Sequence, residues 1–355
     1  MSAVSKVERP RPTIAFISNE AGVSKATVSL ALNGSPLVAR DTAKRIFEIA
    51  RKYNYRPSAI ARSLSLGKSG IISLFVVGSK EHASERLLSS SWMFYNPILR
   101  SISLTLSRAK YHFQFEILNP DFDDEQDVIV RHIQERASDG VILLCYDEFT
   151  YSISDFIENA NCPIVTINRK ISDKLSSFQI DNVKGAKSVV DYLIVKGHTR
   201  IAHICGPANS YNAQDRKKGY IEAMSEYGME IPEAYLAVGD WKIESGYAAT
   251  RELMELSDPP TALFCSNDHM AIGALEALRE LRLRVPDDVS VVGFDDSEIS
   301  RVIQPRLTTV RQPLDELGAL AASEVVTRSR DAERQHIVIA PKLIERASCS
   351  LNKKI

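Results

Sequence analysis

Several polar side chains of this 355-residue chain stand where a strand-like apolar run ends, and their chemistry is that of hydrogen bonding. Asn168 follows "PIVTI" and Asp295 follows "VSVVGF". Asn267 and Asp268 follow "ALFCS", and Arg216 opens the helical pattern of "DRKKGY". Carboxylates and amides accept hydrogen bonds from hydroxyl groups, and a guanidinium offers a rigid fork of donors. These residue types are suited to holding a small polar molecule.

The elements that must position these side chains alternate along the chain. Helical patterns such as residues 182–196, 211–227 and 269–281 separate seven strand-like runs, "IISLFVV", "HFQFEIL", "GVILLC", "PIVTIN", "RIAHIC", "TALFCS" and "VSVVGFD". A succession of strand–helix units predicts parallel sheets with helices on both faces. Such sheets bind ligands beyond the carboxyl ends of their strands, where these polar residues stand. The alternative is that they are loop residues and helix caps.

The first part of the chain differs, because it predicts three short helices and no strand. The helical patterns span residues 13–21, 25–32 and 40–53. Gly22 permits the tight turn after the first helix, and Ser24 is a natural N-cap for the second. Two helices joined by a tight turn and braced by a third form a helix-turn-helix, whose second helix enters the major groove of DNA.

The faces of the second helix and the charge of the segment agree with this interpretation. The pattern buries Val28, Ala31 and Leu32 and turns Lys25, Ala26, Ser29 and Leu30 outward. Residues 1–68 hold 12 Lys and Arg against 4 Asp and Glu, a net of +8. The remaining residues hold 32 against 41, a net of −9, so the head alone favours a polyanionic partner. The alternative, a helical cap or dimerisation module, does not explain this excess of positive charge.

Enzymatic chemistry has no recognisable motif in this chain. No GxGxxG follows a strand, and GxxxxGK[ST], GxSxG and HExxH are absent. Asp295 and Asp296 are adjacent carboxylates, but neighbours at a strand end point apart and do not share a proton. His198 and His203 are not at metal-ligand spacing. We therefore expect no enzyme, no cofactor and no metal, and we expect the five cysteines, without a CxxC pair, to be small core residues.

The opening "MSAVSKVERPRP" has no apolar h-region, and the longest apolar runs are too short to cross a bilayer. We expect a cytoplasmic protein without a secretory signal. A periplasmic binding protein for transport would share the alternating pattern of the body. It would require a signal peptide and no helix-turn-helix, which is the reverse of what this chain shows.

The sequence resembles the lactose-repressor (LacI) family of transcription regulators. The residues that carry the resemblance are "AGVSKATVSLALNGSPLV", "YRPSAIARSL", "LIVKGHTRIAHICGP", "RKKGYIEAM", "NDHMAIGALEALRELRLRVPDDVSVVGFDD" and "PRLTTVRQPLDELG". Each block alone is weak evidence, but six blocks in family order between about residues 13 and 348 are specific.

The resemblance implies roles for residues of the head. Lys25 and Ala26 match the first exposed positions of the recognition helix, which read bases. Leu64 matches the hinge-helix wedge that inserts into the minor groove at the operator centre. Positions that touch phosphates are matched by Thr13, Ser24, Thr27, Ser29 and Asn33.

The chain departs from the family pattern at three places. Leu30 stands where most members have a polar or cationic base reader, so we expect an apolar contact there, for example with a thymine methyl group. Ala39 replaces the usual Ser cap of the third helix. The segment around residues 78–94 is longer than the common spacing, and its role is open.

For the body, the resemblance implies two doubly wound parallel-sheet lobes, similar to a periplasmic sugar-binding protein, that the chain crosses three times. The polar residues named above would then line the space between the lobes. Trp241 matches a frequent aromatic of that site, where an indole face suits a sugar ring, or it fills a lobe core. Tyr95 matches the opposite rim. These matches favour a neutral polyhydroxylated effector.

The sequence therefore predicts a disordered extension (1–12), a helix-turn-helix domain (13–56), a hinge helix or linker (57–68) and an effector-binding and dimerisation domain (69–355). The expected lobes are residues 69–168 with 304–330, and residues 169–303 with 331–355. We expect a homodimer that binds pseudo-palindromic double-stranded operator DNA, most simply as a repressor. A small effector, expected to be a carbohydrate, would control its DNA affinity.

Overall fold

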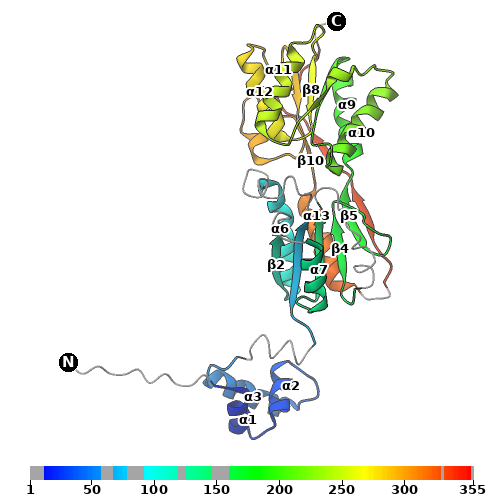
Figure 1. The fold of residues 1–355 in the computed structure, drawn as a ribbon. Helices are drawn as coiled ribbons and strands as arrows, with labels where there is room; N and C mark the ends of the chain where they lie inside the picture. Colours follow the sequence, from blue (N-terminus) through cyan, green and yellow to red (C-terminus); the bar gives the residue numbers. More distant parts are fainter. Residues whose placement is uncertain are drawn as a thin grey trace, which may run out of the picture. The chain divides into compact units, whose positions relative to one another are not determined.

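A computed structural model of the chain describes residues 12–56, 67–77, 92–118, 125–145, 160–328 and 332–352. The chain divides into two compact units, one of residues 1–71 with 136–139 and one of residues 72–135 with 140–355. Their helices and strands are shown in Figure 1. We call residues 13–56 the headpiece and the larger unit the body.

Three helices form the headpiece, α1 (Ile14–Ala21), α2 (Lys25–Leu32) and α3 (Arg40–Lys52). Gly22 ends α1 in the left-handed conformation, with φ 61°, which glycine adopts without a steric penalty. The apolar faces of the three helices meet in one small core, made of Ile17, Ala21, Val28, Ala31 and Ile46. The predicted helices and their inward faces are thereby confirmed.

The N-terminal caps of these helices differ. The Thr13 hydroxyl accepts a hydrogen bond from the backbone N–H of Phe16, and the Ser24 hydroxyl accepts one from the backbone N–H of Thr27. Ala39 occupies the same position before α3 and makes no side-chain capping bond. One backbone donor at the start of α3 therefore lacks the side-chain acceptor that the other two helices have.

The first lobe of the body is built on a six-stranded sheet in the order β11-β5-β4-β3-β1-β2. Its strands are β1 (Ile71–Val77), β2 (His112–Ile117), β3 (Gly140–Cys145), β4 (Ile164–Ile167), β5 (Ser176–Ile180) and β11 (His336–Ile339). The pairs β1–β3, β3–β4, β4–β5 and β5–β11 are parallel. Helices α6 (Trp92–Arg108) and α13 (Leu314–Thr327) cover one face, and α7 (Glu125–Gln134) covers the other.

The second lobe holds a four-stranded parallel sheet in the order β7-β6-β8-β9. Its strands are β6 (Ile201–Cys205), β7 (Leu236–Val238), β8 (Ala262–Cys265) and β9 (Ser290–Val292). Helices α9 (Asn182–Val195) and α10 (Tyr211–Glu226) pack on one face, and α11 (Ile243–Met254) and α12 (Asp268–Glu280) pack on the other. The predicted doubly wound body with two parallel-sheet lobes is confirmed (Figure 1).

The crossings between the lobes differ from the expected boundaries. Strands β5 and β11 belong to the first sheet, so the chain leaves that lobe after Ile180 and after Ile339. Val310 packs in the core of the second lobe, whereas Leu314 packs in that of the first. The boundaries expected near 168, 304 and 330 are therefore wrong, because the short strands β5, β10 and β11 mix polar and apolar residues and were taken for connecting segments. Strands β10 (Thr309–Arg311) and β12 (Lys342–Ile344) pair antiparallel beside these crossings.

Some expectations fall on residues that the structure does not describe. They are the extension up to residue 11, the hinge helix with Leu64, and the insertion from residue 78 to residue 91. All five cysteines are described and none of them forms a disulfide; four are buried and Cys162 is partly buried, as expected. No helix among the described residues is long and apolar enough to span a membrane.

The uncapped start of α3 generates a prediction. Ala39→Ser should stabilise the first turn of α3 by about 1 kcal/mol, because the hydroxyl would accept from an otherwise unpaired backbone N–H. Hydrogen exchange of the α3 amides in the full-length protein should slow by roughly fivefold. Leu37→Ser, at an exposed position before the helix, is the control and should leave this exchange unchanged. Equal exchange in the two variants would contradict the capping argument.

Candidate DNA-binding and effector sites

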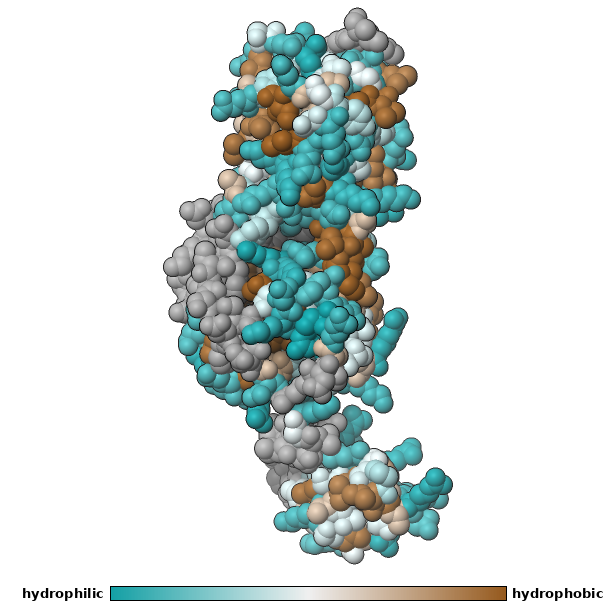
Figure 2. All heavy atoms as spheres, turned by 90° about the vertical axis from the view of Figure 1, so that its right-hand side faces the viewer, coloured by the Kyte–Doolittle hydropathy of each residue, from teal (hydrophilic) through white to brown (hydrophobic). Residues whose placement is uncertain are grey.

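Helix α2 presents the expected base-reading face to solvent. Lys25, Ala26 and Leu30 are exposed, the last with 41% of its surface accessible, while Val28 and Ala31 are buried beneath them. Figure 2 shows hydrophobic side chains grouped on the headpiece surface, where the large exposed apolar residues are Phe16, Leu30, Leu37 and Phe47. An exposed leucine on a groove-entering helix is suited to the methyl group of a thymine.

The five residues expected at phosphates gather around the ends of α1 and α2. Thr13 and Ser24 are the N-caps of these helices, and the Ser24 hydroxyl lies 2.9 Å from that of Thr27. Ser29 lies within α2, and Asn33 is its C-cap residue. The capping hydroxyls place exposed oxygens beside helix N-termini, where the helix dipole favours anions such as phosphate.

Arg216 is the central side chain of the candidate effector site. It is 3% exposed and projects from α10 toward the carboxyl ends of β8 and β9. Its Nε donates to Asn182 Oδ1 at 2.9 Å, and its Nη1 donates to the carbonyl of Ser266 and lies 3.6 Å from Asp295 Oδ1. The guanidinium carbon lies 3.8 Å from the centre of the Phe294 ring. A cation this deeply buried is held in place by its partners on every side.

Asp295 follows β9 in an unusual backbone conformation, with φ 123°. Its backbone N–H donates to the carbonyl of Val310, and Gln312 Nε2 donates to its Oδ1 at 2.7 Å. Burial raises the pKa of Asp295 to about 8, while the Arg216 charge acts in the opposite direction. The carboxyl group can therefore both donate and accept hydrogen bonds near neutral pH.

Trp241 packs closely on a backbone segment at the end of β6. A Cβ atom at Gly206 would lie 2.5 Å from the indole Cη2, so only glycine fits beneath the ring. The guanidinium carbon of Arg216 lies 5.5 Å from the indole ring. The Trp241 carbonyl accepts from Asn267 Nδ2 at 2.9 Å. Asn267 also caps α12, since its Oδ1 accepts from the backbone N–H of Met270.

Two expected site residues have internal roles. Asp268 is fully buried, and its carboxylate accepts from the hydroxyls of Ser297 and Thr309 and from the backbone N–H of Ser297. Burial raises its pKa to about 6. Tyr95 is 3% exposed and lies in the core of the first lobe, not at a rim. Both expectations are corrected, because a position after a strand or at a helix start does not determine which way a side chain turns.

Three residues of the candidate effector region were not predicted from the sequence. They are Asn182, Gln312 and Arg169. Asn182 follows β5, and recognising "SSFQI" as a strand would have placed it among the residues beyond strand ends. Arg169 follows the expected Asn168, and its guanidinium lies 3.7 Å from the centre of the Tyr211 ring. No sequence signal distinguished Gln312.

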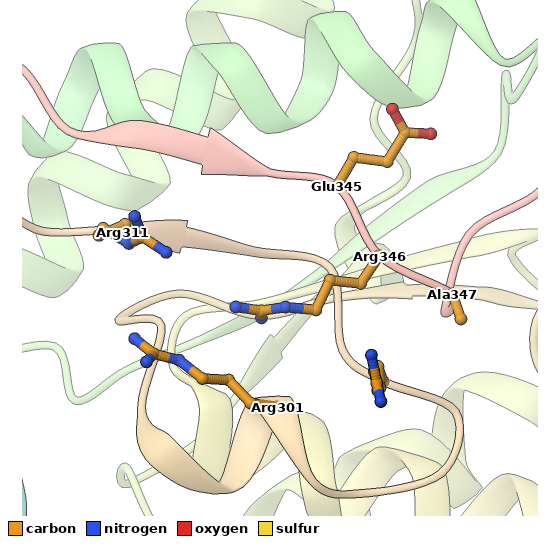
Figure 3. A pocket seen from close by; sticks show the side chains of 6 residues that line it. Arg301, Arg311, Glu345, Arg346 and Ala347 are labelled. Carbon is orange, nitrogen blue, oxygen red and sulfur yellow. The ribbon is translucent and has the colours of Figure 1, made fainter.

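The neighbouring carboxylates of Asp295 and Asp296 point apart, as expected. Asp296, with 1% of its side chain exposed, accepts from Arg311 at 2.6 Å, from Arg301 at 2.9 Å and from Arg346. These arginines line a pocket of about 580 Å³ together with Arg306, Glu345 and Ala347 (Figure 3). Because Asp296 is their shared acceptor, it joins the segment after β9, strand β10 and the segment after β12.

Burial acts to raise the pKa of Asp296, but the hydrogen bonds from Arg346, Arg311 and Arg301 outweigh it and hold that pKa below its usual value. The nearby Glu345 belongs to a different pair, since it accepts from Lys196 and from the Tyr192 hydroxyl. Within the described part of the chain, no group of three His, Cys, Asp or Glu side chains could hold a metal ion.

A helix-turn-helix headpiece and a two-lobed α/β body with polar side chains beyond its strands define the class of ligand-responsive DNA-binding regulators. Comparison with known proteins agrees. Residues 13–58 match the lacI family of bacterial regulatory proteins, and residues 190–349 match the periplasmic binding protein-like domain. The chain belongs to the LacI family.

Among curated proteins, the chain is 35% identical to the probable HTH-type transcriptional repressor ExuR of Bacillus subtilis, over 94% of this chain and 95% of that protein. It is 32% identical to the ribose operon repressor of Escherichia coli, over 95% and 99% of the two chains. These relatives are transcription regulators, so the expectation that this protein is not an enzyme is confirmed.

Two solved structures place the fold in the same family. A CelR–cellobiose complex matches 95% of this chain and all of its own, with 30% identity and a TM-score of 0.69. The Lac repressor dimer bound to operator and the anti-inducer ONPF matches 95% and 99% of the two chains, with 25% identity and a TM-score of 0.80.

The arginine cluster around Asp296 generates a prediction for stability. Asp296→Asn should lower the free energy of unfolding by about 3 kcal/mol, because it removes the charge that three guanidinium groups share in a buried position. Urea unfolding of the full-length protein, followed by circular dichroism, measures this. Asp287→Asn, at an exposed surface pair with Arg284, is the control and should change stability by less than about 1 kcal/mol.

Wild type and Asp296→Asn also test how the stability of the protein depends on pH. The pKa of Asp296 is lowered in the folded state, so its contribution is present above the unfolded-state pKa of about 3.9 and is lost as the pH falls through the lower folded-state value. The stability difference between wild type and Asp296→Asn should therefore shrink below about pH 4. A difference that is constant from pH 7 to pH 3 would contradict this assignment.

Proposed function

We propose that the protein is a cytoplasmic homodimeric repressor that reads its operator with α2. The observation that carries this proposal is the exposed face of α2, with Lys25, Ala26 and Leu30 outward over a buried core. The headpiece lies in the positively charged part of an otherwise acidic chain, which favours DNA over other partners. Thr13, Ser24, Thr27, Ser29 and Asn33 would contact phosphates and set the register. Leu64 would act in the minor groove.

We further propose that a small sugar-like effector binds in the body beside Arg216, Asp295 and Trp241. The relative CelR is in complex with cellobiose, and another relative represses a ribose operon. In this chain the indole ring would face the apolar side of a sugar ring, and Arg216 with Asp295 would bond to its hydroxyl groups. Asn168 would add an amide donor, and Asn267 would hold Trp241 in position.

The proposed control is thermodynamic linkage between the effector and operator sites. An effector that prefers one arrangement of the two lobes changes the arrangement of the DNA-binding segments in the dimer. The coupling is reciprocal, so operator DNA must change effector affinity by the same factor. Inducer and corepressor would use the same side chains.

The first test concerns base reading by Leu30. A duplex selected from a random pool with the full-length protein provides the operator. Leu30→Ala should weaken binding to this duplex by about 1 kcal/mol and relax the base preference at one position of each half-site. Because Leu30 carries no charge, the dependence of binding on salt should stay the same. Leu37→Ala, an exposed leucine outside α2, is the matched control. An unchanged base preference in Leu30→Ala would contradict the assignment.

The second test concerns Asp295. Asp295→Asn should reduce the response to an effector by at least about tenfold, because an amide NH2 replaces one carboxyl oxygen and removes a hydrogen-bond acceptor from the site. The readout is the change in binding of the selected duplex as effector is added, at a protein concentration that gives partial binding for each variant. Asp287→Asn serves as the control. A normal response of Asp295→Asn would refute the proposed effector site.

A further inference from the structure

Arg169 is half-buried, and its positive charge forms no ion pair with a carboxylate of the described residues. Its Nη1 atom is buried and has no hydrogen-bond partner, and its guanidinium carbon lies 3.7 Å from the centre of the Tyr211 ring. The stacking on Tyr211 fixes the plane of the guanidinium but provides no acceptor for its N–H groups. A buried charged donor without an acceptor costs free energy that a bound anion would remove.

The acidic groups near Arg169 along the chain are engaged elsewhere. Asp173 pairs with Lys170, and Asp181 accepts from the backbone N–H of Lys184 as the cap of α9. Asp295, the acid of the candidate effector site, pairs with Arg216 and accepts from Gln312. The elevated pKa of Asp295 makes it a weak source of compensating negative charge at neutral pH. None of these three acids forms an ion pair with Arg169.

Arg169 is connected to the candidate effector site through α10. Tyr211, on which it stacks, is the first residue of that helix, and Arg216 lies on the same helix. The next residue, Asn212, accepts from Asn182 Nδ2 at 3.0 Å, and Asn182 Oδ1 in turn accepts from Arg216 Nε. Arg169 thus lies at the same end of α10 as the polar residues proposed to bind the effector.

Two further buried donors at this site lack acceptors. Asn168 Nδ2 and Trp241 Nε1 are buried and have no hydrogen-bond partner in the part of the chain that the structure describes. The start of α10 also presents backbone N–H donors without a side-chain acceptor. Its cap residue Ser210 makes no side-chain capping bond, and its first turn contains no acidic side chain. All these groups are N–H donors, and helix N-termini favour negative charge. These donors favour a ligand rich in acceptor oxygens, and the Arg169 charge favours one that is negative.

We propose that the effector is a sugar acid whose carboxylate binds the Arg169 guanidinium, an inference that rests on the proposed function. A carboxylate is planar and accepts two parallel hydrogen bonds from a guanidinium, so it fits a fork whose plane Tyr211 has fixed. The sugar ring would then extend toward Trp241 and Arg216. This makes Arg169 a residue that selects acidic over neutral sugars, in contrast to the neutral effector favoured by sequence alone.

The test compares acidic and neutral sugars on the full-length protein bound to its selected duplex. The acidic set is hexuronates and aldonates, and the neutral set is the parent hexoses with pentoses and disaccharides. A hexose 6-phosphate distinguishes a phosphate ester from a carboxylate. We expect a carboxylate to change DNA binding at a concentration at least about tenfold lower than its neutral parent does, because a charge-assisted bond is lost in the parent.

Substitutions of Arg169 test whether this residue is responsible for the response to acidic sugars. Arg169→Gln should weaken the response to the active acid by about 10- to 100-fold and leave any response to the neutral parent nearly unchanged. Arg169→Lys, which keeps the charge but not the fork, should retain part of the response. Arg284→Gln, an exposed arginine paired with Asp288, is the matched control. The comparison of sugars on the wild type stands even if a variant does not fold.

The outcomes separate this inference from the proposed function. Response to neutral sugars but to no carboxylate overturns the inference and leaves a sugar-controlled regulator. Response to the hexose phosphate alone, or an acid response that Arg169→Gln does not diminish, also overturns it. If no member of either set changes DNA binding, the sugar-effector proposal itself fails, and the inference fails with it.

Discussion

The two carboxylates at the end of β9 determine how the second lobe is assembled and where its polar site lies. Asp295 and Asp296 both have positive φ, 123° and 54°, so their side chains leave the backbone in different directions. Positive φ is costly for most residues but accessible to Asp, whose short polar side chain can bond locally. Here side-chain contacts offset the strain, since Asp295 accepts from Gln312 and lies 3.6 Å from Arg216 Nη1, and Asp296 accepts from three arginines.

The two directions have separate consequences. The Asp295 carboxyl group meets Arg216, and through Arg216 it is linked to Asn182 and to the aromatic rings of Trp241 and Phe294. The Asp296 carboxylate meets three arginines from different segments and joins the chain crossings to the second sheet. A site for a ligand and a brace for the fold are therefore built from neighbouring residues.

The headpiece depends on one small apolar core and on the caps of its helices. Its core consists of five small or medium apolar side chains, which is enough to fix three short helices but leaves most of the surface available for DNA. The capping hydroxyls of Thr13 and Ser24 serve both the helix ends and, in our proposal, the phosphates of the operator. Membership of the LacI family is consistent with this division into a basic reader and an acidic sensor.

The sequence by itself determined the elements whose signal is local. Periodicity placed the three headpiece helices and the buried strands β1, β3, β4, β6, β8 and β9, because a continuous apolar run or a 3.6-residue repeat reflects burial directly. Motif order indicated the family, and the position after a strand identified Arg216's partner Asp295. Only the tertiary structure decided which side chains turn toward the site. Asp268 turns inward to Ser297 and Thr309, Tyr95 enters a core, and Arg169 stacks on Tyr211. Side-chain direction, edge-strand pairing and the ion pairs of distant segments depend on contacts far apart in the chain, and no local pattern records them.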